Sequence, residues 1–504
     1  MAEIAAIGIV KRFGGLVAND GVSISAERGE IHAVMGENGA GKTTLMSVLF
    51  GLLEPDAGEI RLRDVPVRFR SPIDAMRAGI GMVHQSFKLF DSLTVWENIV
   101  YGAEPARGLF IDRGAARGRV AELSERRRLA VDPDARVGDL SVGVRQRIEI
   151  LKTLYRDARI LILDEPTAVL TPPERDALFA VLKSLATDGR TILLVTHKLH
   201  EVTAITDRVT VLRDGRTIAS LRTADTNAGE IVRAMTGRNV NLKMAKRAAP
   251  PGDAVLSADG VTIASSSGGR AVDHVSLTVR SGEIVGVAGV AGNGQNELIE
   301  ALVGVRKPNA GQVSISGHDV TRADVATRRA VGLAYIPEDR AAVGSAPAAA
   351  AADNLAMGFH RRAPLASGPF INPSAFAAWA RTLIRRFAIK IANERVNVGT
   401  LSGGNLQKIV VARELAHEAP ALIAEQPTRG LDVAAAESIH AQIVAERDRG
   451  RAILLVSAEL SEILALSDRV LVMFEGRILA NLPREEADEH SVGLLMAGRG
   501  AEAA

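Results

Sequence analysis

One loop and one pair of acids in the first half of the chain have the residue types and spacing needed to bind a phosphate group. Residues 36–43 read Gly-Glu-Asn-Gly-Ala-Gly-Lys-Thr and follow the apolar run 31–35, which fits the pattern G-x-x-x-x-G-K-[ST] between a strand and a helix. In such a loop the backbone N–H groups and a helix N-terminus converge on phosphate oxygens. Lys42 would reach the β- and γ-phosphates, and the Thr43 hydroxyl would bind Mg²⁺.

The acidic pair Asp164-Glu165 directly follows the apolar run 160–163, which has the character of a buried strand. At the carboxyl end of that strand Asp164 could hold Mg²⁺ through water, and Glu165 could polarise a water molecule for attack on phosphorus. Each acid taken alone fits a solvated turn equally well. The same holds for three further candidates, which singly fit structural, loop and core roles: His197, Gln85 and Phe13.

The elements that must position these residues occur twice, because the chain repeats itself. Matching segments are 29–31 with 282–284, 140–141 with 401–402, 207–209 with 468–470, and 235–238 with 496–499. The first pair is offset by 253 residues and the other three by 261. A constant offset that steps once predicts a duplicated domain with eight extra residues in the middle of the second copy. We expect domains at 1–242 and 254–504, joined by a Pro-rich linker at 243–253.

Within each copy, short β-branched and aliphatic runs such as 160–163 and 192–195 alternate with longer segments of helical character. This alternation predicts an α/β fold with buried parallel strands. Residues 94–137 are rich in Arg and Ala and lack strand signals, so we expect an inserted helical subdomain there. The predicted fold class is therefore two α/β domains in tandem, each with a helical insertion.

Composition narrows the class of function. A chain of 504 residues is too long for one hydrophobic core, and the near balance of 61 Lys+Arg against 59 Asp+Glu gives no sign of a nucleic-acid-binding surface. The absence of cysteine excludes disulfides, thiolate metal sites and thiol nucleophiles. No apolar run approaches the roughly 18 residues of a membrane span, and the N-terminus has no signal-peptide layout. We expect a folded cytosolic protein whose membrane role, if it has one, comes through a partner.

The order of these motifs resembles the nucleotide-binding domain of ABC ATPases, over almost the whole chain and twice. The resemblance rests on the lysine loop, Gln85, Ser141 with Gly143, Asp164-Glu165 and His197. It implies two tandem P-loop ATPase domains that use ATP and Mg²⁺. In that family two domains enclose two ATP molecules, and each site combines the lysine loop of one domain with the signature loop, Leu-Ser-Gly-Gly-Gln, of the other. The second half supplies Leu-Ser-Gly-Gly-Asn at 401–405.

Carried over residue by residue, the resemblance implies one complete ATP site. Its catalytic residues would be Glu165, His197 and Gln85, with Mg²⁺ held by Thr43, Gln85 and Asp164. The predicted ATP-binding residues are Phe13 (stacked on adenine), Gly36, Glu37, Asn38, Gly39, Ala40, Gly41, Lys42, Thr43, Thr44, Ser402, Gly403, Gly404, Asn405 and Asp432.

The two copies have diverged in opposite directions. At the positions that correspond to Lys42, Thr43, Gln85, Asp164, Glu165 and His197, the second half carries Gln295, Asn296, Glu338, Glu425, Gln426 and Ala458. The first half in turn has the altered signature Leu-Ser-Val-Gly-Val, of which Ser141 and Gly143 remain, and lacks a counterpart of Asp432. Random decay would have spread losses over both sites, so this sorting predicts one complete site and one degenerate site.

Two classes of function are compatible with twin ATPase domains. A transporter subunit fits the short linker and the single degraded site, whereas ribosome-acting twin ATPases generally carry a long charged arm and two complete sites. Within transporters the chain resembles the ATP-binding subunits of bacterial importers for simple sugars and nucleosides. The residues at 82–85, 140–143, 167–172 and 335–340 resemble those of the nucleoside branch. The resemblance implies integral-membrane permease partners, an associated solute-binding protein, and a peripheral location on the cytoplasmic face of the plasma membrane. Residues 86–98, with Phe87, Leu89, Phe90 and Trp96, are the candidate permease contact, and these side chains fit an ordinary core role equally well.

Overall fold

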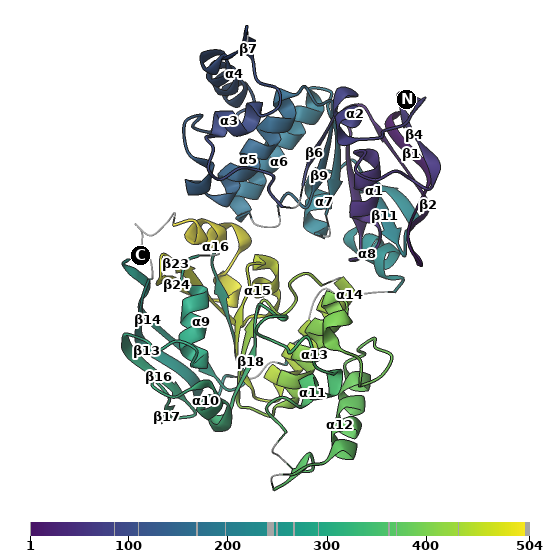
Figure 1. Ribbon diagram of the computed structural model, residues 1–504. Helices are drawn as coiled ribbons and strands as arrows, with labels where there is room; N and C mark the ends of the chain where they lie inside the picture. The colour runs from purple at the N-terminus through teal and green to yellow at the C-terminus, as the bar shows by residue number, and fades with distance from the viewer. Residues whose placement is uncertain are drawn as a thin grey trace. The chain divides into compact units, whose positions relative to one another are not determined.

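The computed structural model describes residues 2–84, 86–108, 110–167, 170–196, 198–238, 246–247, 250–265, 268–290, 292–360, 363–368, 370–431 and 433–498. The chain divides into two compact units, Met1–Val240 and Asn241–Ala504, called unit 1 and unit 2 below (Figure 1). No helix in these ranges is both long enough and apolar enough to cross a lipid bilayer.

Unit 1 contains strands and helices in alternation. Its strands are β1 Ala2–Phe13, β2 Leu16–Glu27, β3 Ile31–Gly36, β4 Ala57–Leu62, β5 Val65–Val67, β6 Ile80–Val83, β7 Ala106–Arg107, β8 Phe110–Ile111, β9 Ile160–Asp164, β10 Thr191–Val195, β11 Arg208–Arg213 and β12 Arg216–Arg222. Its helices are α1 Lys42–Leu49, α2 Pro72–Arg77, α3 Val95–Val100, α4 Arg113–Arg126, α5 Val142–Tyr155, α6 Pro172–Thr187, α7 Leu199–Ile205 and α8 Ala228–Thr236, with 3₁₀ turns η1 Val137–Asp139 and η2 Thr223–Asp225.

Unit 2 repeats this order. Its strands are β13 Ala254–Ala264, β14 Arg270–Arg280, β15 Ile284–Ala288, β16 Ala310–Ile315, β17 His318–Asp319, β18 Leu333–Ile336, β19 Ala366–Ser367, β20 Phe370–Ile371, β21 Ala421–Glu425, β22 Ala452–Val456, β23 Arg469–Phe474 and β24 Arg477–Pro483. Its helices are α9 Gln295–Val303, α10 Val325–Val331, α11 Ala351–Ala356, α12 Pro373–Arg386, α13 Gly403–Ala416, α14 Val433–Asp448, α15 Leu460–Leu466 and α16 Glu489–Met496, with 3₁₀ turns η3 Val398–Thr400 and η4 Arg484–Glu486.

Each unit is built around a six-stranded sheet of the same topology, β6-β9-β10-β3-β11-β12 in unit 1 and β18-β21-β22-β15-β23-β24 in unit 2. All neighbours pair in parallel except the last strand, which is antiparallel in both units. A four-stranded antiparallel sheet accompanies each, in the orders β2-β1-β4-β5 and β14-β13-β16-β17. The predicted fold class, two tandem α/β domains, is confirmed.

Alternation along the central strands explains why both faces of the sheet are covered. In β9, Ile160 and Ile162 pack with α1 and the antiparallel sheet, whereas Leu161 and Leu163 pack with α3, α5 and α6. A parallel strand buried on both faces reads as a continuous apolar run, which is why this strand was visible in the sequence. The predicted parallel strands at 160–163 and 192–195 are confirmed as β9 and β10.

The helical insertion is present in both units, and each copy also contains a short hairpin that the composition did not indicate. A short hairpin, β7 with β8, interrupts it in unit 1, and β19 with β20 does so in unit 2. In unit 1 the hairpin turn contains Gly108, whose φ is 67°. Strands of two residues carry no periodicity, so the composition of this segment could not reveal them.

The eight additional residues of the second copy are distributed over the helical insertion. The offset between matching elements is 253 at β6 and β18, 256 at α3 and α11, 260 at α4 and α12, and 261 at α5 and α13. Three of the residues therefore lie between β18 and α11, four between α11 and α12, and one between α12 and α13. Surface segments between packed elements accept insertions at low cost, so the sheets keep their register.

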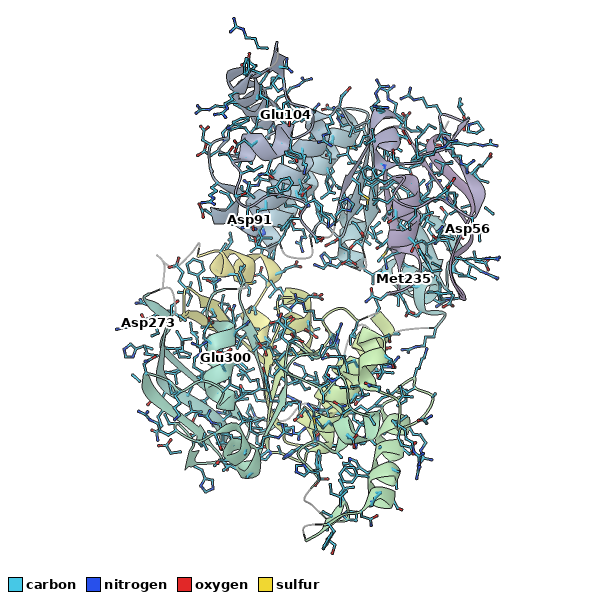
Figure 2. All side chains as sticks on the ribbon, in the orientation of Figure 1. Asp56, Asp91, Glu104, Met235, Asp273 and Glu300 are labelled. Carbon is cyan, nitrogen blue, oxygen red and sulfur yellow. The ribbon has the colours of Figure 1, made fainter. Side chains whose placement is uncertain are left out.

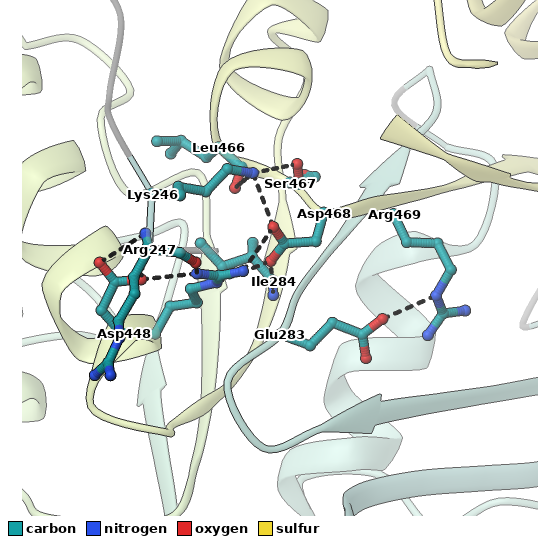
Figure 3. Close-up of polar contacts among 10 residues, drawn as sticks. Lys246, Arg247, Glu283, Ile284, Asp448, Leu466, Ser467, Asp468 and Arg469 are labelled. Carbon is teal, nitrogen blue, oxygen red and sulfur yellow. Dashed lines mark hydrogen bonds and ion pairs between the residues drawn. The ribbon is translucent and has the colours of Figure 1, made fainter. Parts of the chain in front are cut away.

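Two residues within the linker, Lys246 and Arg247, are attached to unit 2 by charged groups (Figure 3). Lys246 Nζ donates to the carbonyl oxygens of Leu466 and Ser467 at 3.2 and 2.7 Å, where α15 ends, and lies 2.9 Å from Asp468 Oδ1. Arg447 donates to the carbonyl oxygen of Arg247 at 2.6 Å and also pairs with Asp468. A cation at the C-terminus of a helix is favourable because the free carbonyls there carry partial negative charge.

Candidate functional site

The lysine loop of unit 1 connects β3 to α1 and is shaped by its glycines. Gly41, immediately before the helix, has φ of 94°, and a Cβ added there would collide with the carbonyl oxygen of Ala18. Gly39 has φ of 83° and faces open space. Only glycine adopts these conformations without strain, so the backbone can turn its N–H groups outward.

Lys42 closes over this loop. Its Nζ donates to the carbonyl oxygens of Gly36 and Glu37 at 2.8 and 3.0 Å, and the residue is only 6% exposed. Burial lowers the pKa of Lys42, while the carboxylates of Glu165 and Asp164 act in the opposite direction. The amine therefore lies in a partly dry pocket between the glycine loop and the acidic pair. Such a cation is placed to contact an anion that enters the loop.

The acidic pair stands where the sequence predicts it, at the carboxyl end of β9. Burial raises the pKa of Asp164, and the neighbouring charge of Glu165 raises it further, while hydrogen bonding from the Thr43 hydroxyl opposes the rise. The two neighbouring carboxylates and the Thr43 hydroxyl offer oxygen ligands, which a hard divalent cation prefers. Among the residues that the structure describes, no group of three or more His, Asp or Glu side chains forms a ready metal site.

Glu165 occupies a backbone conformation that is unusual for its residue type. Its φ is 48°, and its N–H donates to the carbonyl oxygen of Val195 at 2.9 Å. Gln426 in unit 2 has φ of 47° and the same bond to Val456 at 2.7 Å. A left-handed non-glycine residue costs on the order of 1 kcal/mol and marks a position whose orientation matters. Both units therefore retain the strained turn, although only unit 1 retains the glutamate.

The residues around position 197 form a buried network. Glu201, fully buried, accepts hydrogen bonds from Thr167 and, at 2.7 Å, from Thr196. Lys198 donates through its backbone N–H to Thr196 at 3.0 Å and through Nζ to the carbonyl oxygen of Thr167 at 3.3 Å. These bonds connect the loop after β9 to the loop after β10, and Thr196 and Lys198 are the sequence neighbours of the predicted catalytic residue His197.

Three predicted site residues lie outside the described residues: Gln85, His197 and Asp432. The other members of the predicted site in unit 1 belong to the lysine loop, where Gly36, Ala40, Gly41 and Lys42 are buried and Asn38, Gly39 and Thr43 are exposed, with Glu37 and Thr44 between these extremes. Phe13 lies apart from them at the end of β1 and is 47% exposed, with Lys11 Nζ 5.8 Å from its ring centroid. Its ring is therefore accessible for stacking.

In unit 2 the glutamines that replace the lysine and the glutamate bond to backbone groups. Gln295 replaces the lysine, is 6% exposed, and donates through Nε2 to the carbonyl oxygen of Val290 at 3.1 Å. Gln426 accepts from the backbone N–H of Ala458 at 3.1 Å. Asn296 is exposed at the start of α9. Residues 289–296 contain no Lys or Arg that could take the role of Lys42.

The acid of unit 2, Glu425, has a partner that sequence reasoning missed. Tyr335 Oη donates to Glu425 Oε2 at 2.6 Å, and the backbone N–H of Glu338 donates to the same oxygen at 3.2 Å. Burial raises the pKa of Glu425, as does the charge of Glu300 on α9, which Figure 2 labels. Tyr335 stands where unit 1 has Met82, and a polar residue in that buried strand was the available signal.

The signature loops differ in how their helices begin. In unit 2, Ser402 caps α13 by accepting from the N–H of Asn405 at 3.5 Å. The Asn405 side chain in turn donates to Ser402 Oγ at 3.0 Å and accepts from the N–H of Lys390 at 2.8 Å. In unit 1, Ser141 precedes α5 without a side-chain cap, and Gly143 lies against the Glu174 carboxylate. Asn405 therefore positions the intact loop, which includes Gly403 and Gly404.

Comparison with known proteins agrees with this geometry. The family described as ABC transporter matches residues 19–168 and again residues 272–429. The guanosine import ATP-binding protein NupO of Bacillus subtilis is 46% identical over 98% of this chain and 97% of its own length. The nucleoside import ATP-binding protein NupA of Lactococcus lactis is 45% identical, with 98% of each chain covered. A ribose import ATP-binding protein of Rubrobacter xylanophilus is 41% identical over 97% of each chain.

Both units therefore carry the fold and the motifs of one family, and the likeness extends over nearly the full length of several relatives. The chain belongs to the ABC transporter family, as an ATP-binding protein with two ATPase domains in tandem whose ATP hydrolysis is coupled to transport.

Proposed function

We propose that this protein is the energy-coupling subunit of an ABC importer for nucleosides, and that it hydrolyses ATP at one of its two sites. The observation that carries the proposal is the contrast between the acidic turns. In unit 1 the buried Asp164 and its neighbour Glu165 lie beside Lys42 and Thr43, whereas in unit 2 Glu425 is bound by Tyr335 and Gln426 by the backbone of Ala458.

The complete site takes MgATP on the lysine loop of unit 1. Lys42 leaves the loop carbonyls to contact the outer phosphates, and the N–H groups of 39–43 surround them. Thr43, Asp164 and Gln85 would hold Mg²⁺, which supplies charge neutralisation to the phosphates. Glu165 orients and polarises the attacking water, and His197 contacts the γ-phosphate. Phe13 stacks on the adenine.

The signature loop of a second domain completes the site. Ser402, Gly403, Gly404, Asn405 and Asp432 provide this half, from the same chain or from a second copy. The degenerate site would combine Gln295, Asn296, Glu338, Glu425, Gln426 and Ala458 with Ser141 and Gly143. Loss of a general base costs typically 10²–10⁴-fold in rate, so this second combination should not turn over.

Permease subunits are the partners that transmit the ATP cycle to the membrane. A surface pocket in unit 1 supports this, since its wall is apolar at Phe50, Met76 and Met82 and basic at Lys88 and Arg156. An apolar segment with acidic flanks fits such a pocket. Of the predicted contact segment, Lys88 lines the pocket, whereas Leu89 and Trp96 pack against the core. The protein would then be peripheral on the cytoplasmic face of the plasma membrane, with a solute-binding protein as an indirect partner.

The corresponding surface of unit 2 is built differently, which supports unequal permease contacts. Arg329 and Arg413 pair with the buried Glu414 at 2.9 and 2.7 Å, at positions that match Met76, Lys152 and Thr153 of unit 1. Burial acts to raise the pKa of Glu414, but the two guanidinium groups hold it below its ordinary value. In unit 1 these three positions line the pocket, so the two units present different side chains there.

Uptake of labelled nucleosides, ribose and xylose in source cells tests the proposal, with wild-type protein compared with Glu165→Gln. We expect the variant to lose nucleoside uptake and to keep sugar uptake. Loss of sugar uptake alone would favour the second candidate, a simple-sugar importer. The 41% identity to a ribose import protein supports this candidate. Unchanged uptake of all three solutes together with normal ribosome function in cells that lack the protein would contradict both.

A further inference from the structure

The helices that follow the two signature loops begin in surroundings of opposite charge. α13 begins at Gly403 in unit 2, and α5 begins at Val142 in unit 1. Both helices have 14 residues, and the N-terminus of a helix carries partial positive charge that attracts anions. The charge of the side chains beside each N-terminus therefore decides whether an incoming phosphate group is attracted or repelled.

In unit 2 an arginine lies on the first turn of α13. One terminal nitrogen of Arg340 is 2.6 Å from the position that a Cβ would take on Gly403 and 3.6 Å from the same position on Gly430. The other donates to the carbonyl oxygen of Arg429 at 2.8 Å. The absence of side chains at both glycines is thus what admits the guanidinium group between the two loops.

The backbone around Arg340 is held in a defined turn. Asp339 Oδ1 accepts from the N–H groups of Ala341 and Ala342 at 2.9 and 2.8 Å, and the Asp339 carbonyl oxygen accepts from Gly344 at 2.9 Å. This turn lies between β18 and α11, in the segment where unit 2 has three more residues than unit 1. Arg340 is therefore presented by a feature that the first copy does not share.

Arg340 has no acidic partner among the residues that the structure describes. Glu338, two residues earlier in the chain, pairs with Arg429 instead. A guanidinium group next to the positive end of a helix is unfavourable by itself, because the charges have the same sign. An anion bound at this position would interact favourably with both.

In unit 1 a carboxylate lies on the first turn of the signature helix, at Gly143, which matches Gly404, the residue after Gly403. Glu174 accepts from the N–H and the hydroxyl of Thr171 through Oε2, both at 3.0 Å, and its Oε1 lies directly over Gly143 at the start of α5. Ala435 is the matching residue in unit 2 and carries no charge. The degenerate signature thus has its own anion, and the intact one has a cation.

We propose that Arg340 is a further ATP-binding residue of the complete site, which contacts the terminal phosphate together with Ser402 and Gly404, and that Glu174 excludes phosphate from the other signature loop. The inference rests on the proposed function, because it requires ATP at the complete site. It adds a cation from unit 2 to the lysine that the loop of unit 1 supplies.

Equilibrium binding of ATP in a Glu165→Gln background tests the assignment, since that background retains the nucleotide. We expect Arg340→Gln to weaken ATP binding roughly tenfold, Arg340→Lys to weaken it less, and Arg340→Glu, which imitates the charge of unit 1, to weaken it most. The exposed Arg322, in the same unit, provides the matched control Arg322→Gln, which should bind ATP as the parent does. ATP binding should also become less sensitive to salt when Arg340 loses its charge.

Two results would overturn the assignment. If Arg340→Gln and Arg340→Lys lower the thermal midpoint but bind ATP like the parent, Arg340 only holds the turn. If Glu174→Gln, which keeps the hydrogen-bonding shape, leaves binding of a second ATP unchanged within error, the exclusion by charge is wrong. Failure of the proposed function gives a different result, because then Lys42→Gln would also bind ATP normally.

Discussion

The turns after β9 and β21 share one backbone and carry different chemistry. Both hold a non-glycine residue at a φ near 50° and bond it to the strand that follows, through Val195 in one unit and Val456 in the other. In the first turn the carboxylates of Asp164 and Glu165 lie near a lysine and Asp164 also accepts from a threonine hydroxyl, whereas in the second turn the carboxylate is bound by a tyrosine. The comparison teaches that a duplicated site can lose its chemistry while its backbone strain remains, because the strain belongs to the fold of the sheet edge.

The largest effect should come from replacing the general base, Glu165. Glu165→Gln is expected to lower steady-state ATP hydrolysis by about 10²–10⁴-fold, because the general base is lost. The reciprocal change, Gln426→Glu, should restore almost nothing, since Gln295 and Asn296 replace the lysine and the threonine in unit 2. ATPase rates of the two purified variants check this. Substantial turnover in Glu165→Gln would show that the second turn is catalytic after all.

The lysine loops give the next effect. Lys42→Gln reproduces the residue of unit 2 and should weaken ATP binding about 10- to 100-fold, which corresponds to about 1.5–3 kcal/mol for a charged hydrogen bond. Gln295→Lys is the matched opposite and should change ATP binding less than about threefold, because its neighbours remain altered. Fluorescent ATP titration measures both. A large gain in Gln295→Lys would mean that charge alone separates the two loops.

Removing the buried carboxylates sharpens the comparison through stability. The pKa values of Asp164 and Glu425 are raised mainly by burial, so each group favours the folded state at low pH and loses that contribution as the pH rises through its folded pKa. Asp164→Asn and Glu425→Gln should therefore raise Tm by a few degrees at most at pH 8 and by less at pH 5. Only Asp164→Asn should lose ATPase activity. Equal losses of activity would contradict the assignment of catalysis to unit 1.

The smallest effect concerns the linker contact, which unit 1 lacks because Ala186 stands where unit 2 has Arg447. Lys246→Gln removes three contacts of the side chain and should speed tryptic cleavage after Arg247 several-fold, with a cost of about 1 kcal/mol or less. Mass spectrometry of the fragments measures the cleavage, and ATPase activity should stay unchanged. An unchanged cleavage rate would mean that Lys246 does not hold the linker.

Much of the fold could be predicted because its signals are local. The apolar runs of β9 and β10 and the glycine pattern before α1 each lie within a few residues, and the repeat allowed every assignment to be made twice. The hairpin β7–β8 could not be predicted, because two-residue strands have no period. The contact of Tyr335 with Glu425 joins residues 90 positions apart, and no local pattern links them.

The sequence by itself determined the duplication, the family motifs and the sorting of intact and altered residues between the two copies. Only the tertiary structure decided what each altered residue does: that Gln295 and Gln426 bond to backbone groups, that Glu425 is held by Tyr335, and that Arg340 and Glu174 stand at the start of the two signature helices. The physical reason is that motifs depend on spacing along the chain, whereas charge and burial depend on which distant loops the sheets bring together.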